Sequence, residues 1–129
     1  AALRGVDVRI LLPGIIDHYL PWLAAFSFYD DLRQAGVKIY NYSEGFMHQK
    51  TFVVDEQLAG IGTANLDNRS FRLNFETMAL LFDAKAAKDL AEILKNDFAQ
   101  SSLLTKNLNQ QKWSIRLLAP MARLLSPVL

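Results

Sequence analysis

Branched apolar runs alternate with longer helical patterns along the first hundred residues of the chain. The run over 6–12 ends at a Pro-Gly pair, which predicts a strand followed by a turn. Residues 15–34 carry many aromatic side chains and predict a helix, with Gly36 as its C-terminal cap. A second branched run over 37–42 completes a strand-helix-strand unit, whose two strands are expected to be parallel.

Further strands and a helix are expected in the second half of this stretch. Residues 47–54 and 58–62 predict two strands joined by a turn at 55–57, and 77–82 predicts another apolar strand. Over 84–98, apolar residues recur three and four positions apart, which predicts a helix that packs one face on a sheet. We therefore expect a mixed α/β fold with a largely buried β-sheet and flanking helices. Four phenylalanines are assigned to its core: Phe71, Phe75, Phe82 and Phe98.

The C-terminal segment has a different pattern, which separates apolar from basic residues on a helix. Lys112, Arg116 and Arg123 share a face that lies away from much of the apolar set. A basic amphipathic segment of this kind can lie in a membrane interface and bind anionic headgroups. The apolar residues at helical spacing are Trp113, Leu117, Met121, Leu124 and Val128.

The same segment has a second interpretation, as a C-terminal helix that docks on the domain or on a neighbour with its basic residues solvated. The pattern leaves both interpretations open, because Pro120 and Pro127 interrupt it. We divide the chain into a body over 1–105 and a basic amphipathic tail over 106–129.

Composition narrows the functional classes. The 129 residues are 51% hydrophobic and 21% charged, which suits one globular domain rather than a disordered chain. The net charge of +1 provides no overall attraction for nucleic acid, so nucleic acid is not an expected partner. The chain has no cysteine and two histidines, which excludes disulfides and disfavours a metal site. No segment approaches the ~20 apolar residues of a membrane-spanning helix.

The strongest chemical signal is the segment HQKTFVVD, which begins at His48 and is followed by GTAN. Side chains two positions apart on a strand point the same way, so His48 and Lys50 are expected to project together. Such a pair suits an ionised phosphate, because an imidazole can attack phosphorus or donate a proton and an ammonium can neutralise oxygen charge. Asn65 adds an amide donor, and Gly62 allows the backbone to approach a ligand. The alternative for His48 is a partly buried histidine with a local hydrogen bond.

The spacing of these residues, His-x-Lys-x4-Asp-x6-Gly-Thr-x-Asn, resembles the HKD signature of the phospholipase D superfamily. Longer segments around it resemble the C-terminal half of bacterial cardiolipin synthases, and the likeness covers essentially the whole chain. These segments are RGVDVRILLPG, SFYDDLRQAGVKIY, GFMHQKTFVVD, GTANLDNRSFRLNFE and RLLSPVL.

In that family two HKD half-sites meet across a pseudo-twofold interface, where one histidine forms a phosphohistidine and the other protonates the departing alcohol. The resemblance places His48 in the half-site that supplies the acid and base, and Glu76 matches the carboxylate that orients the imidazole. The chemistry requires no metal and no cofactor. The implied catalytic set is His48, Lys50, Asp55 and Glu76, with Asp55 in a supporting role. The implied phosphate ligands are Lys50, Thr63 and Asn65, with Thr63 also shaping the pocket.

The resemblance implies a phosphatidyltransferase of the bacterial inner membrane, which converts two phosphatidylglycerol molecules into cardiolipin and glycerol. Such a cycle needs two imidazoles, so the expected partner is a missing N-terminal HKD half or a second copy of the chain. Because the chain opens directly into a strand without an initiating Met, we expect it to be part of a longer protein. The alternatives are a dimeric phospholipase D-like phosphodiesterase and a non-catalytic module that binds anionic lipid through its tail. For two other polar residues, we expect Arg69 to form a structural salt bridge and His18 to lie at the surface.

Overall fold

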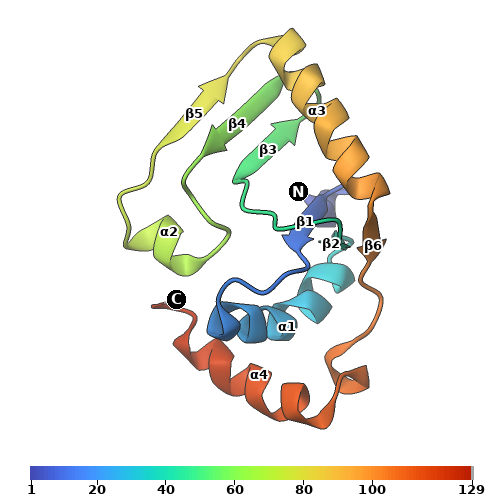
Figure 1. Ribbon diagram of the computed structural model, residues 1–129, viewed down its shortest axis with the longest axis vertical. Helices are drawn as coiled ribbons and strands as arrows, with labels where there is room; N and C mark the ends of the chain where they lie inside the picture. Colours follow the sequence, from blue (N-terminus) through green and yellow to red (C-terminus); the bar gives the residue numbers. More distant parts are fainter. Residues whose placement is uncertain (129) are drawn as a thin grey trace.

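The chain folds into two three-stranded β-sheets with helices packed against them (Figure 1). The structure is a computed structural model that describes residues 1–128, so Leu129 of the predicted tail lies outside the described residues. One sheet contains β1 (Arg9–Pro13), β2 (Lys38–Tyr42) and β6 (Ser101–Leu103), and the other contains β3 (Thr51–Val54), β4 (Leu58–Gly62) and β5 (Met78–Leu81). The α-helices are α1 (Tyr19–Gln34), α2 (Asn68–Arg72), α3 (Ala84–Ala99) and α4 (Trp113–Leu125), and the short 3-10 helices are η1 (Ala2–Arg4) and η2 (Leu108–Gln110).

The β1–β2–β6 sheet confirms the predicted strand-helix-strand unit. β1 runs parallel to β2, with Arg9 opposite Lys38, and α1 connects the two strands. Gly36 follows the end of α1 with a φ of 92°, a left-handed conformation that favours glycine, so it closes the helix as predicted. β6 pairs antiparallel with β2 and was not predicted, because three residues are too few to show a pattern.

The three predicted strands of the second sheet are confirmed as an antiparallel β3–β4–β5 meander, except that the first begins at Thr51 rather than at residue 47. Asp55 and Glu56 in the β3–β4 turn have φ values of 51° and 54°. The Gln57 amide donates to the Val54 carbonyl oxygen at 3.0 Å. Two successive left-handed residues match the right-handed twist of the strands, so the turn fixes the register of this hairpin.

α3 covers one face of the β3–β4–β5 sheet and leaves the opposite face open. Ala59 of β4 forms a buried cluster with Ala87 and Leu90 of α3. On the other face, Phe52 and Leu80 are exposed. The α/β class with flanking helices is therefore confirmed. The expectation of a largely buried sheet is corrected, because the strands divide into two sheets and the second is covered on one face only.

Three of the four phenylalanines assigned to the core lie at the surface. Phe71 is 67% and Phe82 80% exposed, and Phe75 is fully exposed. Phe98 is partly buried, and its ring lies 4.9 Å from the ring of Tyr40 in an edge-on arrangement. Apolar character predicts that a side chain is covered, but it does not predict that the cover comes from the same chain.

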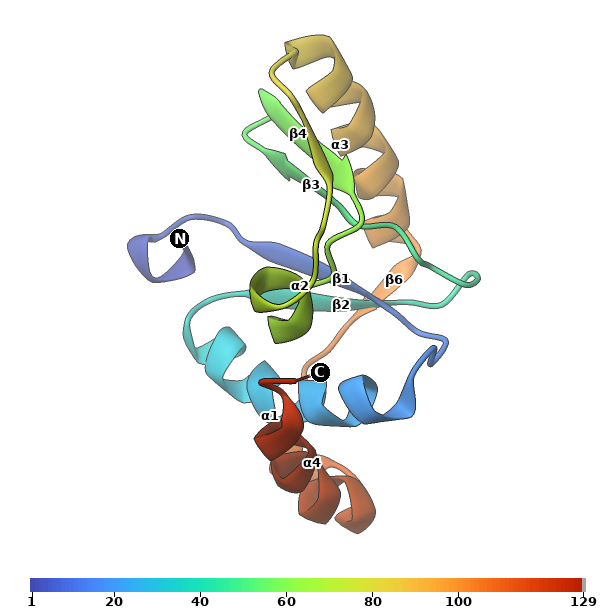
Figure 2. The ribbon, with the colours of Figure 1, turned by 90° about the vertical axis from the view of Figure 1, so that its left-hand side faces the viewer.

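The tail over 106–129 contains the short η2 and one α-helix, α4, which docks on α1. Ala119 and Ala122 of α4 are buried against Leu23 and Ala24 of α1. The helix continues through Pro120, so the expected interruption does not occur there. α4 lies beyond α1 as the outermost element of this end of the molecule (Figure 2). None of the helices in the described part of the chain has the length and apolar character needed to cross a membrane.

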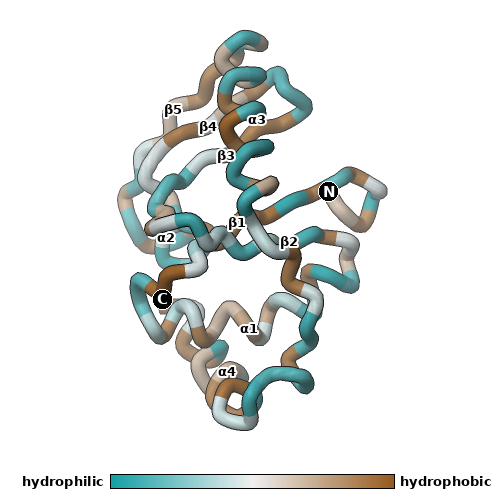
Figure 3. Tube along the Cα trace, turned by 45° about the vertical axis from the view of Figure 1, so that its right-hand side comes forward, coloured by the Kyte–Doolittle hydropathy of each residue, from teal (hydrophilic) through white to brown (hydrophobic). Residues whose placement is uncertain are grey.

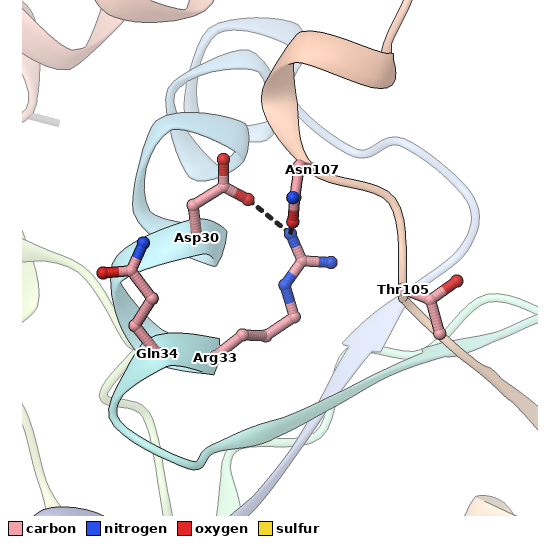
Figure 4. A pocket seen from close by; sticks show the side chains of 5 residues that line it. All are labelled: Asp30, Arg33, Gln34, Thr105 and Asn107. Atoms are coloured by element: carbon pink, nitrogen blue, oxygen red, sulfur yellow. Dashed lines mark hydrogen bonds and ion pairs between the residues drawn. The ribbon is translucent and has the colours of Figure 1, made fainter.

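Polar contacts hold the segment between β6 and α4 against α1 (Figure 4). Arg33 donates to the Leu104 carbonyl oxygen at 3.1 Å and to Asn107 Oδ1 at 2.8 Å, and it also pairs with Asp30. Asp30 accepts in turn from the Leu108 amide at 3.0 Å. A polar pocket of about 330 Å³ is lined by Asp30, Arg33, Gln34, Thr105 and Asn107. Because Arg33 is engaged by three partners, we interpret this pocket as part of the attachment of α4 rather than as a ligand site.

Candidate active site

His48 and Lys50 lie immediately before β3, and their side chains meet. Lys50 Nζ is 2.8 Å from His48 Nε2 and 3.2 Å from Nδ1, and it donates to the His48 carbonyl oxygen at 3.2 Å. An ammonium can only donate, and the tautomer of the His48 ring decides which of its two nitrogens accepts from Lys50. The pair therefore presents a positive charge beside a basic ring nitrogen on the surface of the chain, on one side as the alternation predicted.

The backbone before β3 explains why the two side chains face the same way. The Gly62 amide donates to the Lys50 carbonyl oxygen at 3.1 Å, which extends the β3–β4 pairing by one residue and keeps this stretch extended. The intervening Gln49 points elsewhere, and its Nε2 donates to Asp97 of α3 at 2.9 Å. Alternation thus sends Gln49 toward α3, and His48 and Lys50 toward each other.

Glu76 ties the loop between β4 and β5 into a hydrogen-bonded unit. Its Oε2 accepts from Thr63 Oγ1 at 2.5 Å. Its Oε1 accepts from Ser70 Oγ and from Asn74 Nδ2, both at 3.0 Å. Thr63 Oγ1 accepts in turn from the Thr77 amide at 3.0 Å. The carboxylate therefore joins the two ends of the loop to its middle.

These hydrogen bonds lower the pKa of Glu76 from its ordinary value. The bond from Thr63 is the largest cause, the other two follow, and the positive charge of Lys50 adds to the shift. Within residues 1–128, no hydrogen bond or ion pair joins Glu76 to His48, so the structure does not bring these two residues into direct contact. Glu76 interacts with the histidine–lysine pair electrostatically, through the positive charge of Lys50.

α2 fixes the position of Asn65. Asp67 caps this short helix by accepting from the Ser70 amide at 2.7 Å, and Ser70 Oγ accepts from the Asn65 amide at 3.0 Å. Ser70 is buried, whereas Asn65 is exposed. The Asn65 carboxamide makes no hydrogen bond to any residue that the structure describes, so it is available to a ligand.

Gly62 serves the sheet rather than a ligand. A Cβ at this position would lie 2.2 Å from the Thr77 carbonyl oxygen and 2.8 Å from Met78 Cα. Both are backbone atoms of the neighbouring strand, so a larger residue requires that strand to move. The close backbone approach expected from the sequence exists, but its partner is β5, which corrects the expected approach to a ligand.

The structure does not bring Asp55 to the histidine–lysine pair. Asp55 is exposed in the hairpin turn, whereas Lys50 precedes the other end of β3. At about 3.3 Å per residue, an extended strand separates these two positions by roughly 15 Å. The structure therefore groups His48 with Lys50, and Thr63 with Glu76, and leaves Asp55 at a distance.

Sequence reasoning missed the structural roles of three residues near the site. The Phe46 ring stacks on the His48 ring, with centroids 5.9 Å apart and planes 11° apart. Ser70 and Asn74 hold Glu76, and only Ser70 had a signal, namely its place three residues after the capping Asp67. The expected salt bridge of Arg69 is wrong, because Arg69 Nε donates to Asn74 Oδ1 at 3.2 Å.

This arrangement can bind an anion and transfer a proton. Lys50 and Asn65 supply donors of the kind that bind phosphate oxygens, and His48 supplies an imidazole that can donate or accept a proton. His18, the other histidine of the chain, is exposed at the start of α1, as expected, and lies 3.6 Å from Asp17. In the described part of the chain, no three potential metal ligands cluster together.

Comparison with known proteins identifies the family of this chain. The family described as "Cardiolipin synthase, PLD-like domain" matches residues 1–98. The whole chain is 44% identical to the major cardiolipin synthase ClsA of Bacillus subtilis, of which it covers 27%. It is 46% identical to a cardiolipin synthase of a Geobacillus species and 42% identical to cardiolipin synthase A of Pseudomonas fluorescens, covering 26% and 27% of them. The chain therefore spans about a quarter of the length of these relatives.

Two solved structures share the fold. Nuc of Salmonella typhimurium, a phospholipase D family member, has a TM-score of 0.67 and 21% identity over 80% of this chain and 67% of its own. The phosphatidylserine synthase of Haemophilus influenzae has a TM-score of 0.63 and 20% identity over 99% of this chain and 37% of its own. At such identities these structures support the fold alone. Together with the family match, they lead to one assignment: the chain belongs to the phospholipase D-like domain family of cardiolipin synthases.

Proposed function

We propose that this chain is the part of a bacterial cardiolipin synthase that carries one of two HKD half-sites. In the reaction, the phosphatidyl group of one phosphatidylglycerol passes to a hydroxyl of a second one, and glycerol leaves. The observation that carries the proposal is the contact between Lys50 Nζ and His48 Nε2 in a chain of this family. One group can hold an anionic phosphate, and the other can exchange a proton with the oxygen bonded to it.

The proposed cycle has two steps. In the first, a histidine of the complementary half attacks phosphorus, a P–N bond forms and the P–O bond to glycerol breaks. Glycerol is a poor leaving group as an alkoxide, so His48 in its imidazolium form protonates that oxygen. In the second step, the neutral His48 takes the proton of the incoming hydroxyl, whose oxygen forms the new P–O bond and releases the other histidine.

Substrate binding is proposed to reorganise the histidine–lysine pair. Without an anion, Lys50 donates to the imidazole, and two positive charges this close would repel each other. A phosphodiester attracts the ammonium to its own oxygens and adds a negative charge beside the ring. Both effects favour the imidazolium, which is the form that the first step requires.

The other site residues are proposed to hold the phosphate or its surroundings. The free carboxamide of Asn65 is assigned, with Lys50, to the phosphate oxygens. The Thr63 hydroxyl already donates its hydrogen bond to Glu76, so its main role is to shape the pocket, and it binds phosphate only when that bond breaks. Glu76 positions the loop and influences the imidazole through Lys50, and Asp55 supports the hairpin.

The partner of the site is proposed to be a second HKD half, from the same polypeptide or from another copy of the chain. One observation in support is that the chain has one histidine at the site. Another is a group of exposed apolar side chains in and around α2, which we name the site patch. A patch of this kind is typical of an interaction surface. The site patch consists of Leu66, Phe71, Leu73 and Phe75.

Formation of cardiolipin from phosphatidylglycerol in vesicles tests the proposed function. In the full-length protein that the proposal implies, His48→Ala is expected to lower the rate by about 10² to 10⁴-fold, the usual contribution of a general acid and base. His18→Ala, which removes the other histidine of this chain, is the matched control and should retain the wild-type rate. Wild-type cardiolipin formation by His48→Ala would reject the proposal, as would equal losses in the two variants.

A further inference from the structure

α4 docks on α1 through small residues and exposes its large apolar side chains. Ala119 is fully buried, whereas Leu117 is 59% and Leu124 80% exposed. A helix that served only as a cover for α1 would turn its largest apolar residues inward. Docking on α1 therefore does not explain why a row of large apolar side chains is exposed, and we name this row the apolar stripe. It consists of Trp113, Leu117, Met121, Leu124 and Val128, all of which are exposed.

The apolar stripe faces away from the rest of the molecule. Its first four members follow one another at intervals of three and four residues, so they form a continuous row along one side of α4, and Val128 lies in the turn after the helix ends at Leu125. Ala119 and Ala122, which contact α1, lie on the other side of α4. α1 lies between α4 and the β1–β2–β6 sheet, and hydrophobic residues recur along α4 (Figures 2 and 3). No other element of the described structure covers the stripe.

The charged residues of the C-terminal segment that carries the apolar stripe are of one sign. No acidic residue follows Asp97 in the sequence, whereas the body that precedes this point has more acidic than basic residues. The net positive charge of the chain is therefore concentrated in its C-terminal quarter. The basic residues of this region are Lys106, Lys112, Arg116 and Arg123.

One of these basic residues, Arg123, contacts α1, and two others at the helix, Lys112 and Arg116, can bind an external anion. Arg123 pairs with Asp31 of α1 at 3.2 Å and lies 4.4 Å from the centre of the Phe28 ring. Lys112 precedes α4 and Arg116 lies on its first turns, and neither makes an ion pair or a side-chain hydrogen bond with the residues described. At helical spacing, these two cations lie on one side of the stripe, between the stripe and the face that docks on α1.

We propose that α4 lies in the surface of an anionic bilayer, with the apolar stripe among the acyl chains and Lys112 and Arg116 at the headgroup phosphates. A row of large apolar residues flanked by free cations is the pattern that such a surface binds. Trp113, at the start of the stripe, suits the boundary between water and lipid. A second copy of α4 fits less well, because it would bring the same cations and no carboxylate.

The C-terminal end of α4 lies near the loop of the candidate active site. A groove of about 530 Å³ is lined by Leu124 of the stripe, Phe28 of α1 and Asn68 of α2, among others. Asn68 is the first residue of α2 and directly follows Asp67, which caps this helix beside Asn65. The groove therefore places the end of α4 beside the loop that carries Asn65. The inference extends the proposed function without depending on it, because bilayer binding is measured without turnover.

Vesicle sedimentation of the full 129-residue chain tests the inference. Vesicles of phosphatidylcholine alone are compared with vesicles that also contain phosphatidylglycerol or phosphatidylserine. The wild-type chain is expected to bind both anionic mixtures more tightly than phosphatidylcholine. Since phosphatidylserine is not the proposed substrate, binding to phosphatidylglycerol alone would indicate the active site instead and would overturn the inference.

Matched variants separate the stripe from general effects. Leu117→Asp is expected to weaken binding about tenfold or more, because it removes one buried leucine from the lipid contact. The control is Ile93→Asp on α3, whose side chain is 53% exposed against 59% for Leu117, and it should bind as the wild type. Arg116→Gln should weaken binding to anionic vesicles about fivefold, and Lys88→Gln, an exposed lysine on α3, less than twofold.

Tryptophan fluorescence provides a second measurement. In a Trp22→Phe background, Trp113 alone should shift its emission to shorter wavelength on anionic vesicles and be quenched by brominated acyl chains. Circular dichroism checks that each variant keeps the wild-type fold. Equal binding of Leu117→Asp and Ile93→Asp, or an unquenched Trp113, would overturn the proposal. A wild-type dimer that Leu117→Asp converts to monomers, without vesicle binding, would assign the stripe to a second copy and overturn it as well.

Discussion

The site patch and the apolar stripe both expose large apolar side chains, but their charged surroundings differ. The site patch is interspersed with charges of both signs, from Asp67, Arg69 and Arg72. On its own helix the stripe has only basic charged neighbours, and Asp31 of α1 is paired with one of them, Arg123. Mixed charges and hydrogen-bonding groups around an apolar centre are typical of protein interfaces, whereas a purely basic border is typical of lipid-binding helices. Exposed apolar area thus indicates that a partner exists, and the charges around it indicate which kind.

The largest expected effect in this comparison concerns assembly through the site patch. Phe75→Ser is expected to weaken the association of this chain with the complementary half about 30-fold, as for an aromatic residue at an interface hot spot. The stability of the isolated chain should change by less than about 0.5 kcal/mol, because the side chain is fully exposed there. Analytical ultracentrifugation of the two separately purified halves measures the association.

Ile93→Ser, on the outer face of α3, is the control for this change, and it should leave the association unchanged. Equal affinities of Phe75→Ser and the wild type would remove the site patch from the interface.

A smaller effect is expected where α4 docks. Ala119→Leu should destabilise the chain by about 1–3 kcal/mol, because a larger side chain overpacks a fully buried position between two helices. Ala99→Leu, at the exposed end of α3, is the matched control and should change the stability by less than about 0.5 kcal/mol. Urea unfolding provides both values. Identical midpoints for the two variants would mean that α4 does not pack on α1 as described.

The elements themselves follow closely from local patterns. Period-two and period-three-to-four apolar spacing predicted the strands at 37–42 and 77–82 and the helix at 84–98, because each is set by neighbours in sequence. The division into two sheets was not predictable in this way, since it depends on which distant strands pair. The exposure of Phe71 and Phe75 could not be predicted for a similar reason, because the apolar character of a side chain does not indicate which molecule covers it.

The candidate site was predicted in part. The contact of His48 with Lys50 follows from strand alternation, which needs only two adjacent positions to be extended. The bonds from Ser70 and Asn74 to Glu76 depend on the path of the loop around α2, and no local spacing determines that path. Gly62 was correctly identified as a point of close approach, but only the pairing of β4 with β5 shows what approaches it.

The smallest expected effect concerns Glu76, whose hydrogen bonds stabilise the loop that carries the site patch, and it has no counterpart in α4. Glu76 has a lowered pKa in the folded chain, so the stability that its ionised form contributes is complete above the ordinary glutamate pKa. This contribution is lost as the pH falls through the lower pKa of the folded state. The difference in unfolding free energy between the wild type and Glu76→Gln should therefore shrink in acid.

Urea unfolding between neutral and acidic pH measures this difference. Glu92→Gln, an exposed carboxylate of α3 that makes no hydrogen bond with the described residues, is the control. A difference for Glu76→Gln that stays constant down to strongly acidic pH would contradict the hydrogen-bonded role of this residue.

The role of His48 as acid and base, with the nucleophile on another histidine, is tested most directly by changing the leaving group. A phosphatidyl ester of p-nitrophenol releases an acidic phenol that needs no proton, so His48→Ala in the full-length protein should still give a burst of p-nitrophenol while forming no cardiolipin from phosphatidylglycerol. Loss of the burst together with cardiolipin formation would contradict this role, because it would make His48 the residue that attacks phosphorus.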